Sequence, residues 1–176
     1  GVAARVSLRA LQAGDVVLAS PTEAARVIVN QHSAVGLASD VLVIEHSHGT
    51  LALTPDHVLW ADGAFRPAAE VSVGSVLEPA AIVTKITAAT HAVVNPLTTS
   101  GTILAAGPTG APVVASTFSA WIADLLLDTA LPYPLPYSAA AAAAYLFPAS
   151  VQAFYDEKRE PLFSRTATDL KELKAA

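Results

Sequence analysis

Thr54 and His57 stand three residues apart, and both side chains can take part in amide chemistry. Pro55 keeps the residue before it extended, and a tight turn can then return His57 to the same pocket as Thr54. An imidazole can give or take a proton near neutral pH, and a hydroxyl can donate a hydrogen bond to a developing negative charge. Taken alone, His57 is more simply a structural histidine of a hairpin and Thr54 an ordinary strand residue, so the neighbouring segments decide the interpretation.

His32 and Thr117 are further candidates. The pKa of an imidazole suits removal of a proton from an alcohol or from water, although His32 also fits a surface histidine in a loop. Thr117 follows the apolar run from Val113 to Ser116 and is more simply a strand-end hydroxyl. Both remain candidate site residues.

His46 and His48 alternate along one segment, so both imidazoles can face one ion if the segment is a strand. No third ligand is adjacent in the sequence, although three carboxylates can approach in three dimensions: Asp40, Glu45 and Asp56. A solvated hairpin tip is the favoured interpretation, and we predict no metal site.

Gly107 to Gly110 is expected to be a turn, because the lysine and helix that follow a phosphate-binding loop are missing. We therefore predict no cofactor. The chain carries a formal net charge of -5 and has no basic run, which argues against nucleic-acid binding.

The chain contains neither cysteine nor methionine. It therefore has no thiol for nucleophilic chemistry and no disulfide. Without a methionine, Gly1 is not expected to be a translational start, and we expect the chain to be cut or trimmed from a longer protein. We expect no membrane span, because the longest apolar run, Ala139 to Ala149, is short and contains Pro148.

Short apolar or β-branched runs separated by turn residues fill the first 117 positions, which predicts an all-β domain. The turn signals include Asp62-Gly63. The expected strands are Val16 to Ala19, Arg26 to Val29, Asp40 to Glu45, Thr50 to Leu53, Val58 to Ala61, Ser75 to Leu77, Ile82 to Ile86, Ala92 to Val94, Gly101 to Ala105 and Pro112 to Ser116.

A helical period appears only after these strands, which places the domain in residues 1–120 and a helical, Pro/Ala-rich C-terminal extension in residues 121–176. One apolar stripe comprises Phe118, Trp121, Ile122, Leu125 and Leu126. The proline-rich stretch Leu131 to Tyr137 is expected to be a stiff linker rather than a polyproline ligand. Helices are expected at Ala139 to Phe147 and at Thr168 to Lys174, with residues 150 to 176 forming a tail or docking arm.

An internal repeat links Leu11 to Leu18 with Val71 to Leu77. In each, an aliphatic residue stands three positions before a glycine, a polar residue follows the glycine, and a Val-Leu strand start comes next. The repeat predicts two pseudo-symmetric β subdomains. Two ordinary turns of similar sequence are the alternative.

Several segments resemble the Hint module, the autoprocessing domain of hedgehog and intein proteins. LRALQAGDVVLAS, residues 8–20, resembles the strand and turn near the start of the hedgehog module. DVLVIEHSHGTLALTPDHVLWA, residues 40–61, resembles the hairpin that carries the family's Thr-x-x-His motif, which is Thr54 to His57 here. NPLTTSGTILA, residues 95–105, and VVASTF, residues 113–118, resemble two later family segments, in the family's order.

The resemblance implies a Hint-type fold and self-cleavage of an upstream segment through a cysteine-initiated N-to-S acyl shift. It implies that His57 protonates the leaving nitrogen and that Thr54 assists. The thioester formed would pass to a sterol, another alcohol or water. By analogy with hedgehog proteins, it implies an extracellular or secretory location.

The chain departs from the family pattern in three places. The family's opening cysteine belongs upstream of Gly1, and the second family cysteine is replaced by Thr117. The aspartate that helps hedgehog proteins to activate cholesterol has its nearest match in His32. The chain as given is therefore expected to be inactive.

Two other interpretations remain open. A degenerate Hint fold can serve as a non-catalytic structural or interaction module within a larger assembly, which the high apolar content favours. An unrelated small β-barrel would show strands paired in up-and-down order without an internal match.

Overall fold

The computed structural model describes residues 4–32, 38–119, 142–143 and 145–159. Antiparallel strands dominate these residues, as the sequence predicts. The strands are β1 (Val16–Leu18), β2 (Ala24–Gln31), β3 (Ala38–His46), β4 (Gly49–Leu53), β5 (His57–Ala61), β6 (Ala64–Pro67), β7 (Val76–Leu77), β8 (Ala81–Ala92), β9 (Asn95–Thr98), β10 (Thr102–Ala105) and β11 (Val113–Ser119).

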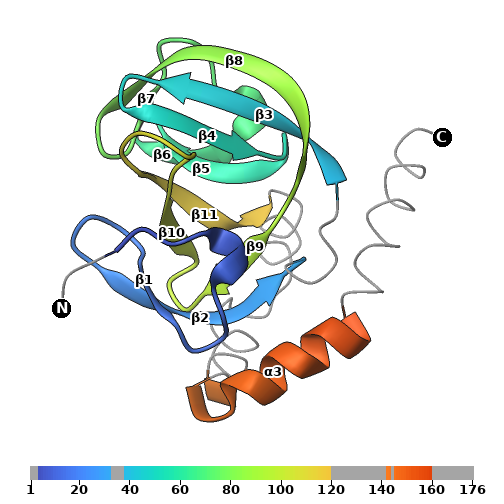
Figure 1. Ribbon diagram of the computed structural model, residues 1–176. Coiled ribbons are helices and arrows are strands. Elements are labelled where there is room, and N and C mark those ends of the chain that lie inside the picture. The colour runs from blue at the N-terminus through green and yellow to red at the C-terminus, as the bar shows by residue number, and fades with distance from the viewer. Residues whose placement is uncertain (1–3, 33–37, 120–141, 144, 160–176) are drawn as a thin grey trace, which may run out of the picture.

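The strands form two curled sheets (Figure 1). β1, β2 and β9 make a three-stranded sheet, and the other eight strands make a larger one in the order β10-β11-β5-β7-β8-β3-β4, with β6 beside β5. This order is not up-and-down, which argues against the simple β-barrel.

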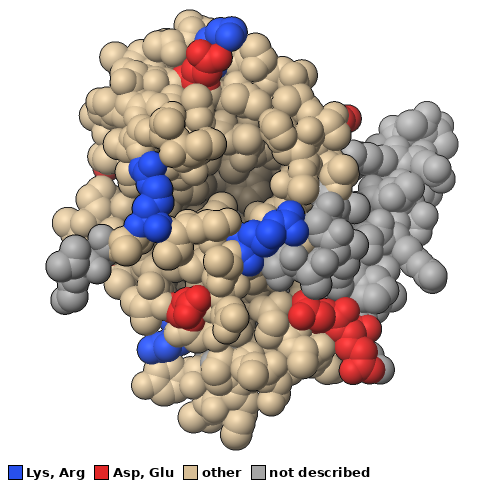
Figure 2. Space-filling model, viewed as in Figure 1, with Lys and Arg blue, Asp and Glu red and all other residues tan. Residues whose placement is uncertain are grey.

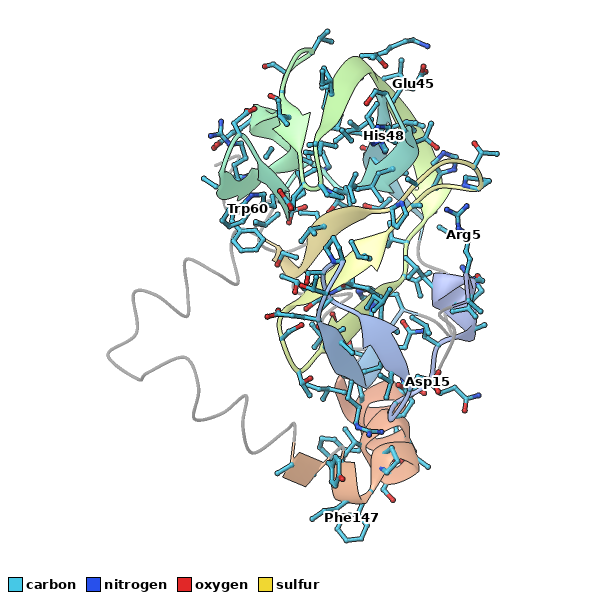
Figure 3. The ribbon with its side chains drawn as sticks, turned by 90° about the vertical axis from the view of Figure 1, so that its left-hand side faces the viewer. Arg5, Asp15, Glu45, His48, Trp60 and Phe147 are labelled. Atoms are coloured by element: carbon cyan, nitrogen blue, oxygen red, sulfur yellow. The ribbon has the colours of Figure 1, made fainter. Side chains whose placement is uncertain are left out.

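A loop after β10 covers the free edge of β4. Gly110 bridges to Gly49, the Ala111 N–H donates to the His48 carbonyl at 2.6 Å, and the Gly107 N–H donates to the Thr50 carbonyl. The guanidinium of Arg5 donates to the Gly110 carbonyl, so the N-terminal arm braces the same loop. Figure 3 shows Arg5 on the flank of the molecule below the hairpin of His48. The predicted turn at Gly107 to Gly110 therefore closes the larger sheet.

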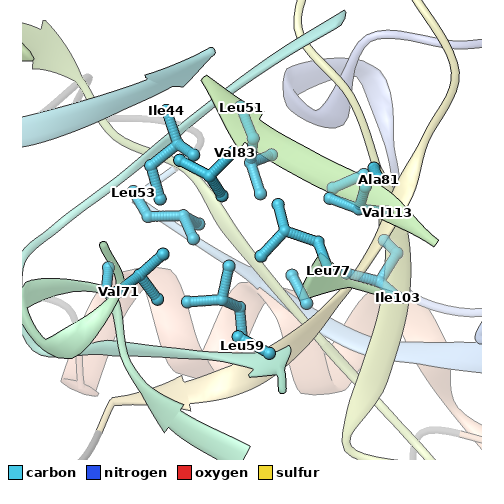
Figure 4. Packing of buried hydrophobic residues seen from close by; sticks show 14 of the residues in the cluster. Ile44, Leu51, Leu53, Leu59, Val71, Leu77, Ala81, Val83, Ile103 and Val113 are labelled. Carbon is cyan, nitrogen blue, oxygen red and sulfur yellow. The ribbon is translucent and has the colours of Figure 1, made fainter. Parts of the chain in front are cut away.

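One hydrophobic core runs through the sheets (Figure 4). Ile44 of β3, Leu59 of β5 and Leu77 of β7 have no exposed surface, and Val27 of β2 belongs to the same cluster. Val58, Leu59 and Ala61 of β5 are buried, and the half-buried Trp60 packs edge-on against Phe65 of β6 at 4.7 Å between ring centroids. The strand that begins with His57 is thus anchored in the core two residues later.

The internal repeat has the same hydrogen-bonding pattern in both copies. Gly14 and Gly74 both have φ of +97°, a conformation that glycine adopts without steric cost. Their N–H groups donate to Val27 of β2 and Val83 of β8, each at 2.8 Å. A short 3-10 turn precedes each copy: η1 (Leu8–Ala10) and η2 (Ala68–Glu70). The two copies are therefore equivalent turns, as the repeat predicts, and not chance look-alikes.

Some strand boundaries differ from those predicted. Ala92 to Val94 is not a separate strand, because β8 continues to Ala92 and the next strand begins at Asn95. β6 was not expected, although the Asp62-Gly63 signal marks its turn: both residues have positive φ, at 53° and 80°, the geometry of a tight hairpin. Phe118 lies on β11, so the predicted helical stripe cannot begin there.

A C-terminal helix packs below β2. It comprises α3 (Pro148–Phe154), followed by the π-helical turn η3 (Tyr155–Arg159), where a tail or docking arm was expected. The side-chain amide of Gln152 pairs with the backbone of Asn30, accepting its N–H at 2.7 Å and donating to its carbonyl at 3.1 Å. The Asn30 side chain in turn donates to the carbonyls of Leu8 and Leu11, each at 2.8 Å. Asn30 thus ties the N-terminal arm and α3 to one strand.

Several expectations fall outside the described residues. They concern the stripe from Trp121 to Leu126, the proline-rich stretch Leu131 to Tyr137, the helix Thr168 to Lys174 and part of the helix Ala139 to Phe147. The domain boundary at residue 120 stays a prediction. No helix in the described part of the chain is long and apolar enough to span a membrane.

Candidate functional site

Thr54 and His57 form the turn that joins β4 to β5. The His57 N–H donates to the Thr54 carbonyl at 3.0 Å, which is the tight turn that Pro55 predicts. Both side chains are half-buried. The backbone of this turn is held between two strands that contribute to the core.

The ring of His57 is oriented by β11. Its Nε2 lies 2.7 Å from the carbonyl oxygen of Ser116, and a carbonyl can only accept a hydrogen bond, so Nε2 carries the proton. In the neutral ring Nδ1 is then the atom with the free lone pair. A register shift in the pairing of β11 with β5, between Ala115 and Ser119, accompanies this contact. Such irregularities re-aim side chains and are common beside active sites.

Burial lowers the pKa of His57 below 6.5, against the smaller raising effects of the Ser116 carbonyl and of the charge on Asp56. We expect a histidine NMR titration to place its midpoint below 6.5 and to show the Nε2–H tautomer. In the unfolded chain His57 binds a proton near pH 6.5, whereas in the folded chain it stays neutral at that pH. The free energy of unfolding should therefore fall as the pH drops through 6.5, and His57→Gln should remove this part of the fall. A midpoint above 6.5, or an Nδ1–H tautomer, would contradict the assignment.

Thr117 lies beside this contact, on the next residue of β11. It has no exposed surface; its N–H donates to the Gly101 carbonyl at 2.9 Å, and its carbonyl accepts from Asn95. Its hydroxyl oxygen has no hydrogen-bond partner among the described residues. The Thr117 hydroxyl is therefore a buried polar group without a hydrogen-bond partner among the described residues.

Thr117→Val should stabilise the chain, because valine keeps the shape and removes the unpaired hydroxyl. An unsatisfied buried polar group costs about 1–3 kcal/mol, so we expect a gain of that order in the free energy of unfolding. Urea denaturation measures it. Thr98→Val is the matched control: Thr98 is equally buried, but its hydroxyl donates to the Thr102 carbonyl at 2.8 Å, so its loss should destabilise. Equal losses in both variants would contradict the interpretation of Thr117.

Asn95 and Gln31 extend the site on the other edge of β11. The Asn95 amide donates to the Thr117 carbonyl at 3.1 Å and to Oε1 of Gln31 at 2.7 Å. The two residues face each other in the pairing of β2 with β9. Neither was predicted as a site residue. The available signal was their amide side chains at the ends of two apolar strand runs.

His32 follows Gln31 directly and has a positive φ of 60°. It is half-buried, and residues 33–37 beyond it lie outside the described part of the chain. Its place next to the Gln31–Asn95 pair is compatible with the predicted part in acceptor activation, which stays a prediction.

His46 and His48 lie at the hairpin between β3 and β4. Burial and the neighbouring His48 lower the pKa of His46, and the His48 N–H donates to Nδ1 of His46 at 3.3 Å. This bond occupies Nδ1 of His46, and its buried Nε2 has no hydrogen-bond partner among the described residues. No group of three or more potential metal ligands lies together among the described residues.

Charged side chains are few on the face shown in Figure 2, and both signs are scattered there. That face has no continuous patch of positive charge of the kind expected on a nucleic-acid-binding surface.

Comparisons with known proteins identify the fold. The structure of the MchDnaB-1 intein superposes with a TM-score of 0.52 at 16% sequence identity, over 61% of this chain and 88% of the intein. The Msm DnaB1 intein splicing domain, solved bound with zinc, gives a TM-score of 0.49 at 20% identity, over 59% of this chain and 84% of that one. No family model matches the sequence, and no curated protein matches it. The chain therefore shares the Hint-like fold of intein splicing domains, at low sequence identity.

Proposed function

We propose that the chain is the Hint-type autoprocessing module of a longer precursor, of the hedgehog type, and that a cysteine before Gly1 supplies its nucleophile. The observation that carries the proposal is the ring of His57, whose Nε2–H is bonded to the Ser116 carbonyl, so that Nδ1 carries the lone pair of the neutral ring. Thr54 lies in the same turn. The chain itself contains no cysteine, so it lacks the usual nucleophile and does not start the reaction alone.

The first step is an N-to-S acyl shift. The cysteine sulfur attacks the carbonyl carbon of the preceding residue, and His57 accepts the thiol proton at Nδ1. The C–N bond breaks as His57 passes that proton to the leaving nitrogen. The products are a thioester and the free amine of the cysteine. A low pKa suits this cycle, because the protonated ring gives up its proton readily. The hydroxyl of Thr54 is proposed to donate a hydrogen bond to the carbonyl oxygen.

The second step transfers the acyl group to an oxygen nucleophile: a sterol, another alcohol or water. The acceptor oxygen forms a bond to the acyl carbon, the C–S bond breaks, and the acceptor proton returns to the sulfur. His32 is the proposed base for this proton. The substrate of the first step is the precursor's own upstream segment. The proposed location of the precursor is extracellular or in the secretory pathway.

Hydroxylamine tests the thioester directly. The precursor with its natural residues before Gly1 restored should release an upstream fragment that ends in a hydroxamate when hydroxylamine is added, since hydroxylamine attacks thioesters. Mass spectrometry of the released fragment identifies its new end. An upstream segment that stays attached under these conditions would contradict the proposal.

Exposed apolar side chains favour a second candidate, a Hint fold kept as an assembly module. Tyr145, Leu146 and Phe147 are each more than 60% exposed, and Phe154 of α3 is 56% exposed. Figure 3 shows Phe147 at the end of the molecule distant from Trp60. Such a patch fits a protein partner. If this candidate is correct, the precursor stays intact in hydroxylamine, and Phe147→Ser with Phe154→Ser weakens its assembly in analytical ultracentrifugation.

A further inference from the structure

One hydrogen bond orients the side-chain amide of Gln31. The side chain is only 9% exposed, and its Oε1 accepts the hydrogen bond from Asn95. Asn95 donates through Nδ2, so the oxygen of the Gln31 amide must face it and the NH₂ group must point elsewhere. No hydrogen bond from that NH₂ group to any described residue is present. This NH₂ group is therefore an oriented donor that is open to a ligand, since it is not among the fully enclosed polar atoms of the described residues.

The surroundings of Gln31 indicate which ligand. Asn95 links Gln31 to the Thr117 carbonyl, and His57 is bonded to the Ser116 carbonyl. These carbonyls belong to successive residues of one strand and therefore point to its opposite edges. His57 and the Asn95–Gln31 pair thus flank the end of β11. Asn95 Nδ2 already donates to Gln31 and to the Thr117 carbonyl, so the Gln31 NH₂ group is the donor that this pair can offer to a group lying over this end.

We propose that the Gln31 NH₂ group binds the carbonyl oxygen of the upstream acyl group, and that Asn95 is the positioning residue that orients it. The inference rests on the proposed function. When sulfur attacks, this oxygen gains negative charge, and an oriented donor stabilises it. The charge returns to the carbonyl when the C–N bond breaks, so Gln31 neither gains nor loses a proton. Because the amide is neutral, it performs this task without changing the charge next to His57.

Gln31→Glu in the precursor tests the contact. Glutamate keeps the oxygen that faces Asn95 and replaces the donor with a carboxylate oxygen. Removal of one oxyanion donor costs about 10²–10³ in rate, so thiol-induced cleavage should slow by that factor. Gln12→Glu is the matched control, because Gln12 is exposed and its side chain is not part of the site. Its cleavage should equal that of the unchanged precursor.

An NMR measurement covers the case in which Gln31→Glu fails to fold. The precursor is made uncleavable by replacing its nucleophilic residue with alanine, and the side-chain NH₂ signals of Gln31 are compared with those of the chain that begins at Gly1. A bond to the carbonyl should move these signals downfield and slow their exchange with water. Unchanged signals would overturn the contact, whether or not Gln31→Glu cleaves slowly.

The two proposals fail in distinguishable ways. A precursor that cleaves, with Gln31→Glu as fast as the control, overturns the role of Gln31 and leaves the autoprocessing function intact. A precursor that does not cleave, but whose Gln31 signals shift, overturns autoprocessing and supports the binding role. If the precursor does not cleave and the Gln31 signals do not shift, both autoprocessing and the binding role of Gln31 are overturned.

Discussion

Replacing His57 by alanine in the precursor is expected to slow thiol-induced cleavage about 10²- to 10⁴-fold, the range for loss of a general acid–base group. In the proposed mechanism, Nδ1 of His57 takes the thiol proton and returns it to the leaving nitrogen, while Nε2 is bonded to the Ser116 carbonyl. The rate is measured from the mass of the released fragment over time. Thr54→Ala removes one hydroxyl donor in the same turn and should also slow cleavage.

His48→Ala controls for loss of an imidazole. His48 is exposed at the hairpin between β3 and β4, away from the turn of Thr54, and its substitution should leave the cleavage rate unchanged. Circular dichroism of each variant shows whether it folds. A His57→Ala variant that folds and cleaves as fast as His48→Ala would remove His57 from the mechanism.

Replacing Gly110 by alanine is expected to cost the chain several kcal/mol of stability. Gly110 has φ of +94°, and an added Cβ would overlap the carbonyl of His48 and the Cα of Gly49, which are backbone atoms. The left-handed conformation costs a non-glycine residue about 1–2 kcal/mol. The overlap adds a further ~1–3 kcal/mol, the usual cost of forcing atoms into a packed place. Urea denaturation measures the sum.

Gly74→Ala separates the two costs. Gly74 has nearly the same φ, +97°, but nothing lies within 4 Å of the added Cβ. Gly74→Ala should lower the free energy of unfolding only by the cost of the left-handed conformation. The difference in stability between Gly110→Ala and Gly74→Ala therefore measures the cost of the overlap with β4 and its hairpin. Equal losses would mean that the loop after β10 does not press on β4 as described.

The sequence is informative about the strands because each is a short run that ends at a turn residue. Periodicity alone missed β9, because Pro96 and the threonines after it read as a loop. It missed β6 because a four-residue strand with Arg66 and Pro67 has too little apolar pattern to stand out. The repeat around Gly14 and Gly74 was the most informative signal, since one turn geometry requires one residue pattern.

The candidate site was only partly predictable. The turn from Thr54 to His57 is local, and Pro55 restricts it, so its geometry follows from neighbouring residues. The contact of His57 with Ser116 joins residues 59 positions apart and depends on a register shift that no local pattern encodes. The bond between Gln31 and Asn95 likewise depends on how β2 pairs with β9.

The intact mass of the precursor, followed with and without dithiothreitol, tests the central claim most directly. We expect the thiol to release the upstream segment and to leave a fragment that begins with cysteine and contains all of the chain from Gly1 onward. An unchanged mass under both conditions would contradict autoprocessing, and the Hint-like fold would then be that of an assembly module.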